Sequence, residues 1–254
     1  MKSISSIKVV LIVVLSLFSW QNVSAQKSLT VGNGKITEHP IPVLEYTNLE
    51  FEANADLYYE LRPDLASDLK MEIDENLIPF ITVELKKDKL TRKEKLVIKT
   101  TVDIKPTKFV IYTNSRAIKD IDINGSGNVY MEKEINTKDL NVKLKGFGSF
   151  KAEKLMTKSM SLEVSGAGSG LLKGTSQSLE LKIGKKGSGS IDASGLAVEE
   201  VKCDISGSGN MNVDASKSLE IKVDGSGSIT YKTLPRIYSH KLSGTGKVEQ
   251  AVAK

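Results

Sequence analysis

A two-glycine motif, G-x-G, recurs through the second half of the chain at an almost constant spacing. Its seven copies begin at Gly125, Gly146, Gly166, Gly187, Gly207, Gly225 and Gly244. The intervals between them are 21, 20, 21, 20, 18 and 19 residues. A fixed period of about 20 residues is the signature of a solenoid, in which each repeat forms one coil of a continuing spiral. This period constrains the fold more than any other feature of the sequence.

Each repeat has the same internal pattern of apolar residues. An alternating segment such as Leu219, Ile221 and Val223 precedes the glycines. Another apolar residue follows two positions after the second glycine in six of the seven copies. Alternation predicts strands with one buried face, and no segment here has the spacing of an amphipathic helix. The sequence therefore predicts an all-β fold, a parallel β-helix with about 20 residues per coil and a G-x-G corner in each.

The glycines also invite two ligand-binding interpretations. A glycine-rich turn after an apolar strand, as in residues 121–130 ("IDINGSGNVY"), can bind phosphate where a helix follows, but no helix is predicted after any copy. Calcium-binding β-rolls use G-G-x-G-x-D repeats, which this chain lacks. We therefore interpret the glycines as corners that adopt backbone angles unfavourable for other residues, and we expect neither a cofactor nor a metal. A polar column follows the corners: Asn128, Ser149, Ser169, Ser190, Asn210, Ser228 and Lys247.

Outward-facing positions carry charges that alternate in sign in six of the seven repeats. The residues three before each corner are Asp122, Lys143, Glu163, Lys182, Asp204, Lys222 and Lys241, where Lys182 allows for an insertion at residues 184–186. In a β-helix such side chains stack above one another, and neighbouring opposite charges attract. We therefore predict a solvated charge ladder, with Glu180, Lys202 and Glu220 as a second one. The single cysteine, Cys203, shares the apolar alternation with Val201 and Ile205, so we predict a buried structural thiol.

Residues 1–25 have the pattern of a secretory signal peptide. Two lysines precede the apolar run at residues 9–18, and a small-residue cleavage site lies at residues 23–25. The run is shorter than the roughly 20 residues of a transmembrane helix, although a retained signal anchor is an alternative. We expect export to the periplasm, the outer-membrane surface or the extracellular space, with no transmembrane segment after cleavage. The net charge of +5 then falls to 34 − 31 = +3, and without a basic cluster interleaved with aromatics we expect no nucleic-acid partner.

The remaining chain is expected to be one domain, residues 26–254. Residues 26–118 contain alternating segments without a regular period, and we expect them to form early, irregular coils and a cap. Residues 119–254 then form the regular G-x-G coils, although two separable domains is an alternative. The segment at residues 74–80 ("DENLIPF") predicts a short helix or turn.

The order of these motifs resembles a known family. "VGNGKIT", "NLEFEANADLYYEL", "DENLIPFITVEL" and "FVIYTN", followed by repeated "GSGN" and "GSGSI", is similar to the GIN-domain family of auto-transporter adhesin head domains, exported proteins typical of Bacteroidota. The resemblance covers roughly residues 32–246. It implies a single-stranded right-handed parallel β-helix in one domain, and a family without an established catalytic activity.

We therefore expect an exported, non-catalytic, adhesion-type module that presents a rigid repetitive surface to an extended ligand, such as a glycan or an envelope protein. The alternative is a polysaccharide-cleaving β-helix enzyme that works from one outer face through acidic residues. Asp192, Asp204, Asp214 and Asp224 are the nearest candidates, but they occupy different slots of the repeat, so we predict no catalytic residues. Self-association through the end coil is a further possibility. The candidate ligand-binding residues are the aromatics Phe147, Tyr130, Tyr231 and Tyr238.

Overall fold

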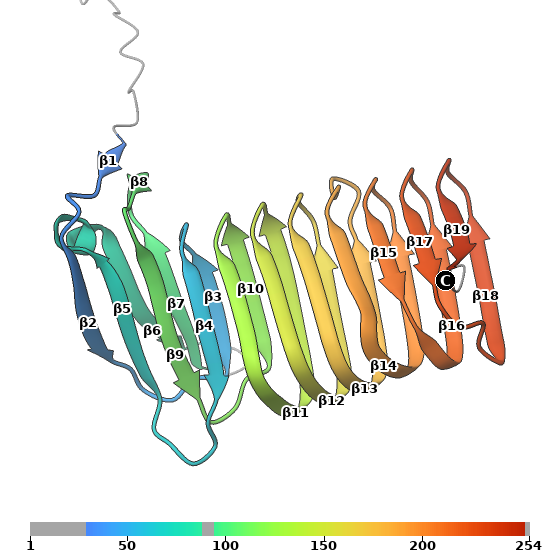
Figure 1. Ribbon diagram of the computed structural model, residues 1–254, viewed down its shortest axis with the longest axis horizontal. Helices are drawn as coiled ribbons and strands as arrows, with labels where there is room; N and C mark the ends of the chain where they lie inside the picture. The colour runs from blue at the N-terminus through green and yellow to red at the C-terminus, as the bar shows by residue number, and fades with distance from the viewer. Residues whose placement is uncertain (1–28, 88–93, 252–254) are drawn as a thin grey trace, which may run out of the picture.

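The computed structural model describes residues 29–87 and 94–251, which form a β-solenoid of about seven coils with about 20 residues each (Figure 1). The predicted signal peptide lies outside the described residues. The elements of the N-terminal part are β1 (Thr30–Val31), β2 (Ile36–Pro42), β3 (Asn48–Glu52), β4 (Asp56–Leu61), β5 (Asp68–Asp74), the 3-10 helix η1 (Glu75–Phe80), β6 (Ile81–Lys87), β7 (Glu94–Thr100), β8 (Ile104–Lys105) and β9 (Phe109–Ser115). Those of the regular part are β10 (Asp120–Gly125), β11 (Asn128–Gly146), β12 (Ser149–Val164), β13 (Ser169–Ile183), β14 (Ser190–Ile205), β15 (Asn210–Val213), β16 (Ala215–Val223), β17 (Ser228–Tyr231), β18 (Ile237–Leu242) and β19 (Lys247–Gln250).

Parallel pairing between successive coils builds two long sheets. On one side β7, β3, β10 and the second half of β11 pair in sequence, and the ladder continues to β18. On the other side β9, β4 and the first half of β11 pair, and this ladder continues to β19. Strands β11 to β14 are long enough to bend from one sheet into the other. The expected parallel β-helix is confirmed.

The N-terminal end differs from the regular coils because three of its strand pairs are antiparallel. They are β2 with β5, β5 with β9, and β6 with β7. Helix η1 joins β5 to β6, and its Leu77 is buried in the core. The short helix or turn expected at residues 74–80 is therefore confirmed as a 3-10 helix, and it contributes an apolar side chain to the cap.

The glycine corners owe their composition mainly to close contact between coils. A Cβ atom at Gly148, Gly168 or Gly209 would lie within 2.0–2.4 Å of the carbonyl oxygen of the glycine one coil earlier. Of the corner glycines, Gly125 and Gly146 alone have a positive φ, 105° and 150°. The expectation that corner glycines serve unusual backbone angles is therefore correct at two positions and wrong at the others, where stacked backbones leave no space for a side chain.

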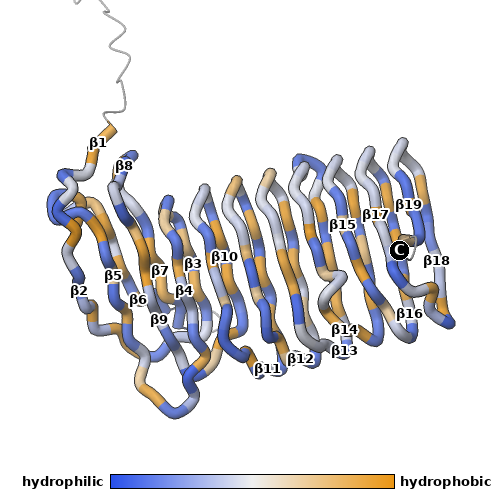
Figure 2. The backbone as a smooth tube through the Cα atoms, viewed as in Figure 1, coloured by the Kyte–Doolittle hydropathy of each residue, from blue (hydrophilic) through white to orange (hydrophobic). Residues whose placement is uncertain are grey.

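The core is a stack of inward-facing apolar columns, and the hydropathy alternates along the strands as the sequence predicts (Figure 2). Cys203 lies in one of these columns between Leu181 and Ile221. Its side chain is buried, and burial raises the pKa of the thiol to about 12, so the predicted structural thiol is confirmed.

The outward columns align as the sequence predicts. Asp122, Lys143, Glu163, Lys182, Asp204, Lys222 and Lys241 are successive partners in the strand register. Glu180, Lys202 and Glu220 are partners in the second column. The predicted alignment is therefore confirmed in both columns, and within the first column Lys222 Nζ lies 3.9 Å from Asp204 Oδ2.

Candidate binding groove

A groove of about 590 Å³ lies where β11, β12, β13 and β14 turn from one sheet into the other. Each coil contributes a short tripeptide to its lining. These are Asn136–Lys138, Met156–Lys158, Thr175–Gln177 and, in part, Ala197–Glu199. Because the contributions stack coil upon coil, the groove runs along the solenoid axis.

The register shows how the groove is built. Asn136, Met156, Thr175 and Ala197 are aligned partners and form one wall. Thr137, Thr157 and Ser176 are aligned partners and form the floor. Small side chains at this turn leave a hollow between the larger core residues on either side.

Hydrogen bonds hold the floor in place. The Thr157 hydroxyl donates to Ser176 Oγ at 2.9 Å, and the Ser176 hydroxyl donates to the Ser178 carbonyl at 2.8 Å. Thr137 Oγ1 donates to the Ile118 carbonyl at 3.3 Å. The floor is therefore a fixed row of hydroxyl groups, and Met156, 47% exposed, adds an apolar surface beside it.

The charges along the groove are unevenly distributed. Lys138 and Lys158 are exposed at one end, and neither forms an ion pair with any described residue. Glu199 lies at the other end, where its carboxylate accepts a hydrogen bond from Lys217 Nζ at 2.7 Å. This bond, with the attraction of Glu199, raises the pKa of Lys217. The first half of the groove therefore carries positive charge that no described residue neutralises through an ion pair.

A second hollow, of about 270 Å³, extends the groove toward the C-terminus. It shares Ala197 and Glu199 with the first and continues past Asp214 and Ser216 to Thr233. Asp214 Oδ1 accepts a hydrogen bond from the Thr233 backbone at 3.2 Å. The combined surface therefore crosses more than four successive coils.

An outward ladder of tyrosines marks the junction between the cap and the coils. Tyr58 stacks on Tyr112 on one side, with ring centroids 5.5 Å apart, and on Tyr130 on the other, at 5.0 Å. Lys70 Nζ lies over the outer face of this stack, 5.1 Å from the Tyr112 centroid. Because the ring faces are occupied by one another and by a lysine, we interpret this ladder as packing that joins β9, β4 and β11.

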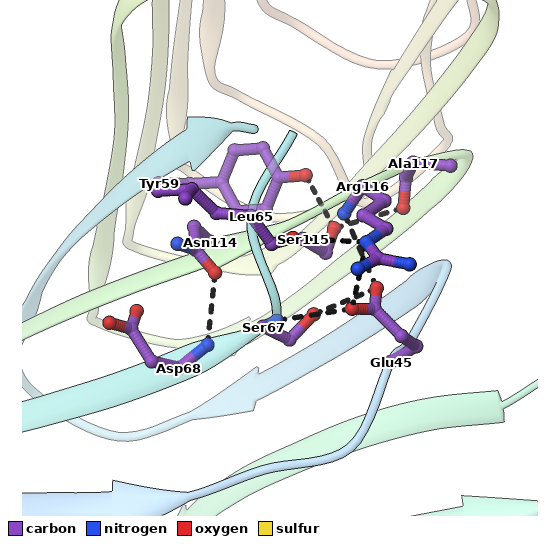
Figure 3. Close-up of polar contacts among 9 residues, drawn as sticks. All are labelled: Glu45, Tyr59, Leu65, Ser67, Asp68, Asn114, Ser115, Arg116 and Ala117. Carbon is purple, nitrogen blue, oxygen red and sulfur yellow. Dashed lines mark hydrogen bonds and ion pairs between the residues drawn. The ribbon is translucent and has the colours of Figure 1, made fainter. Parts of the chain in front are cut away.

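A third hollow, of about 390 Å³, lies beside this ladder and is bordered by Arg62 and Leu65. A polar network fixes the loop that borders it (Figure 3). Glu45 accepts hydrogen bonds from the backbone and hydroxyl of Ser67 and pairs with Arg116, whose Nε also donates to the Leu65 carbonyl at 3.1 Å. Partial burial acts to raise the pKa of Glu45, but the bonds from Ser67 and Arg116 hold it below its usual value. The network ties the loop to the end of β9.

The structure separates the four aromatic candidates. Phe147 projects from a corner with 77% of its surface exposed, whereas Tyr231 is buried. Tyr130 is half-buried in the tyrosine ladder, and Tyr238 packs 5.5 Å from Tyr231 and 5.3 Å from His240. Tyr231 and Tyr238 are therefore brought together, Phe147 and Tyr130 lie on other elements, and none of the four lines the groove.

Of the four aspartates considered for catalysis, two lie on either side of one lysine and the other two make separate backbone contacts. Asp204 and Asp224 flank Lys222, whose Nζ lies 3.9 and 3.7 Å from their carboxylates. Asp192 accepts a hydrogen bond from the Ser194 backbone at 3.0 Å. Among the residues that the structure describes, no group of three or more His, Cys, Asp or Glu side chains is placed to hold a metal ion.

Sequence analysis did not identify the groove, although a signal for it is present. The tripeptides "NTK", "MTK" and "TSQ" recur about one coil apart, each between two apolar alternations. The glycine period hides this repeat because β-bulges lie just before it, at Met131/Glu134, Ala152/Leu155 and Leu171/Lys173, and change the spacing from coil to coil.

Comparison with known proteins places the chain in a family. The family described as "Putative auto-transporter adhesin, head GIN domain" matches residues 45–235. The chain belongs to this family. The matched residues include the whole groove, the tyrosine ladder and six of the seven corners, so these features lie within the GIN domain. No curated protein matches the chain.

Several solved structures have a similar fold. A "putative adhesin" from Bacteroides fragilis NCTC 9343 has a TM-score of 0.80 and 25% identity, and covers 87% of this chain and 99% of its own. A "Putative lipid binding protein" from Parabacteroides distasonis ATCC 8503 has a TM-score of 0.72 and 25% identity, with 89% and 100% covered. A "putative adhesin" from the same strain has a TM-score of 0.70 and 25% identity, with 88% and 100% covered. No helix of the described residues is long and apolar enough to cross a membrane.

Proposed function

We propose that this GIN domain is an exported, non-catalytic adhesion module whose groove binds a linear glycan bearing acidic groups. The observation that carries the proposal is the groove lining, which repeats once per coil from β11 to β14. A repetitive groove on a rigid solenoid suits a repetitive, extended ligand. Membership in a family of adhesin heads supports a binding role.

The chemistry of the lining favours a sugar chain. Hydroxyl and amide groups such as Thr175, Gln177 and Asn136 can exchange hydrogen bonds with sugar hydroxyls, and Met156 can pack against the apolar face of a pyranose ring. Successive coils are about 4.8 Å apart, which is close to the length that one sugar unit adds to an extended chain. Lys138 and Lys158, one coil apart and without ion-pair partners, would then face acidic groups on neighbouring sugars.

The contacts of the acidic residues in the groove support binding without cleavage. Glycoside cleavage by an acid and base needs two carboxyl groups that face one bond. Glu199 is paired with Lys217, and Asp214 accepts a backbone hydrogen bond. The groove therefore offers sugar-binding groups rather than a poised carboxylate pair.

The test is to incubate a protein of residues 26–254 with a polyuronate and with a neutral linear glucan, and to measure retention and newly released chain ends in the same samples. We expect retention of the polyuronate, weakened by salt because the attraction is ionic, without new ends. New chain ends would overturn the non-catalytic proposal in favour of a polysaccharide-cleaving enzyme. Anionic lipid vesicles form a third arm, and binding to vesicles alone would overturn the glycan proposal.

Matched variants localise the binding. Lys138→Gln with Lys158→Gln removes two charges from the groove, and we expect retention of the polyuronate to fall about tenfold or more. The control is Lys145→Gln with Lys185→Gln, which removes the same charge from the corner edge and leaves the groove intact. Equal effects of the two pairs would contradict binding in the groove.

Phe147, the remaining exposed aromatic candidate for ligand binding, lies on a different surface from the groove. Its ring is exposed at a G-x-G corner, whereas the groove lies where β11 to β14 turn from one sheet into the other. We expect Phe147→Ala to leave polyuronate retention within about twofold. A larger loss would place the binding surface at the corners.

A further inference from the structure

The two ends of the described solenoid are finished differently (Figure 1). At the N-terminal end, antiparallel β2 and β6 are the outermost strands, and η1 packs its Leu77 into the core. At the other end, β18 pairs only with β16 and β19 only with β17 among the described residues. The last coil thus has the geometry of an interior coil with one side of its strands unpaired.

The last coil also exposes side chains that are buried elsewhere. Tyr238, His240 and Leu242 continue the inward columns of Leu219, Ile221 and Val223, which are buried one coil earlier. Leu242 is 44% exposed, and Ile237 and Leu234 nearby are 67% and 54% exposed. Unpaired strand edges beside exposed apolar side chains are a template for association with another chain.

Strand β19 has a charge pattern that is complementary to itself. In "KVEQ", Lys247 and Glu249 point outward on either side of Val248, the only partly buried residue of the strand. If two copies of β19 pair antiparallel about Val248, Lys247 of each copy lies opposite Glu249 of the other. Opposite charges directly across an antiparallel pair stabilise it, and the arrangement supplies two such pairs.

We propose that two copies of this chain associate tail to tail through β18 and β19, with β19 antiparallel to its counterpart about Val248. This contact uses the same surface on both subunits and therefore closes as a two-fold dimer. It pairs the open strand edges and covers the apolar side chains of the last coil, including Leu242.

A head-to-tail fibre is disfavoured by the other end of the solenoid. Strand β2 is outermost there, and its Pro40 and Pro42 lack the backbone N–H that a further strand would need. The outermost strand on the other side, β6, carries Glu84, Lys86 and Lys87. The N-terminal end therefore blocks continued stacking, and association stops at two copies.

Charge reversal tests the proposed register. In Glu249→Lys, Lys247 of each subunit would face a lysine of the other, and we expect the dimer dissociation constant to rise at least about tenfold. The double variant Lys247→Glu/Glu249→Lys restores opposite charges across the pair, so we expect dimerisation to return. Asp192→Lys is the control, because Asp192 lies in the same outward column three coils earlier and the change in net charge is identical.

The measurement is sedimentation velocity of residues 26–254 over a range of protein concentrations, with thermal unfolding to show that each variant folds. The result expected is a monomer–dimer equilibrium in the native protein and Asp192→Lys, a monomer in Glu249→Lys, and a restored dimer in the double variant. A native protein that is monomeric at all concentrations would overturn the proposal, as would open-ended polymers or a double variant no better than Glu249→Lys.

Discussion

At the scale of single residues, contact between backbones decides which positions must be glycine. Gly209 has no unusual φ, but a Cβ there would lie 2.0 Å from the Gly189 carbonyl oxygen and 2.7 Å from Ile183 Cδ1. Gly184, in the insertion before the Gly187 corner, has no neighbour closer than 3.8 Å to the same added atom. Two glycines that are 25 residues apart in the sequence therefore have different roles.

This difference is testable by alanine substitution. We expect Gly209→Ala to lower the free energy of unfolding by about 1–3 kcal/mol, because the neighbouring coil must move to admit the methyl group. Gly184→Ala is the control and should be neutral or stabilising by up to about 1 kcal/mol through the unfolded state. Urea unfolding measures both, and equal costs would contradict the backbone-contact explanation.

A second residue-scale prediction concerns Asp74, which is fully buried between η1 and the N-terminal segment. Burial acts to raise the pKa of Asp74, but backbone hydrogen bonds from Gly34 at 2.8 Å and Thr107 at 2.7 Å outweigh it and hold the pKa below its usual value. Because the folded pKa is lowered, its stabilising contribution is present above the ordinary aspartate pKa of about 4 and is lost as pH falls through the folded value.

We expect Asp74→Asn to lower the free energy of unfolding at neutral pH by about 1.5–3 kcal/mol, since hydrogen bonds to a charged acceptor are replaced by weaker ones. The acid-induced loss of stability should be smaller in this variant than in the native protein. Urea unfolding between pH 3 and 7 measures both effects, with exposed Asp139→Asn as the control. An unchanged pH dependence in Asp74→Asn would contradict this role.

At the scale of strands, regular alternation was enough to predict the inward columns, the outward ladders and the coil register. Alternation did not predict the relative direction of paired strands, because β2, β5 and β6 alternate just as the parallel strands do. Their antiparallel pairing depends on the short connections around η1. The groove was missed for another reason. Bulges before it shift the register, so its residues lie outside the period that the glycines define.

The charge ladder yields a prediction at this scale. Asp204 lies between Lys182 and Lys222, and Lys241 follows Lys222, so Asp204→Lys would place four like charges in succession in one column. We expect a loss of up to about 1 kcal/mol at low salt, because exposed charges interact weakly, and a smaller loss at 1 M salt, where they are screened. Asp204→Asn is the neutral control in urea unfolding, and a loss independent of salt would contradict an electrostatic origin.

At the scale of the whole molecule, the solenoid is stabilised by contacts between neighbouring coils. Interior strands such as β12 and β13 have a partner on each side, whereas β18 and β19 have one. Stability in such stacks is close to a sum of coil and interface terms, so it is expected to vary along the axis.

Hydrogen exchange measures this variation. We expect slow exchange in β11 to β14 and faster exchange in β18 and β19 at low protein concentration, because the last coil can open without disturbing the rest. At high concentration the tail-to-tail dimer should slow exchange in β18 and β19 alone. Uniform exchange along the axis would contradict independent opening of the last coil.

The stacked glycine corners have a consequence for how such a protein can change over evolutionary time. Losing one corner residue would break contact with the coils on both sides, whereas duplicating or deleting a whole coil preserves every corner contact. Small additions such as Gly184–Lys186 are tolerated because they leave the strand register intact on both sides, from Ile183 to Ser190. The length of such a solenoid is therefore adjustable in whole coils, and each coil gained or lost in the middle would lengthen or shorten the groove by one step.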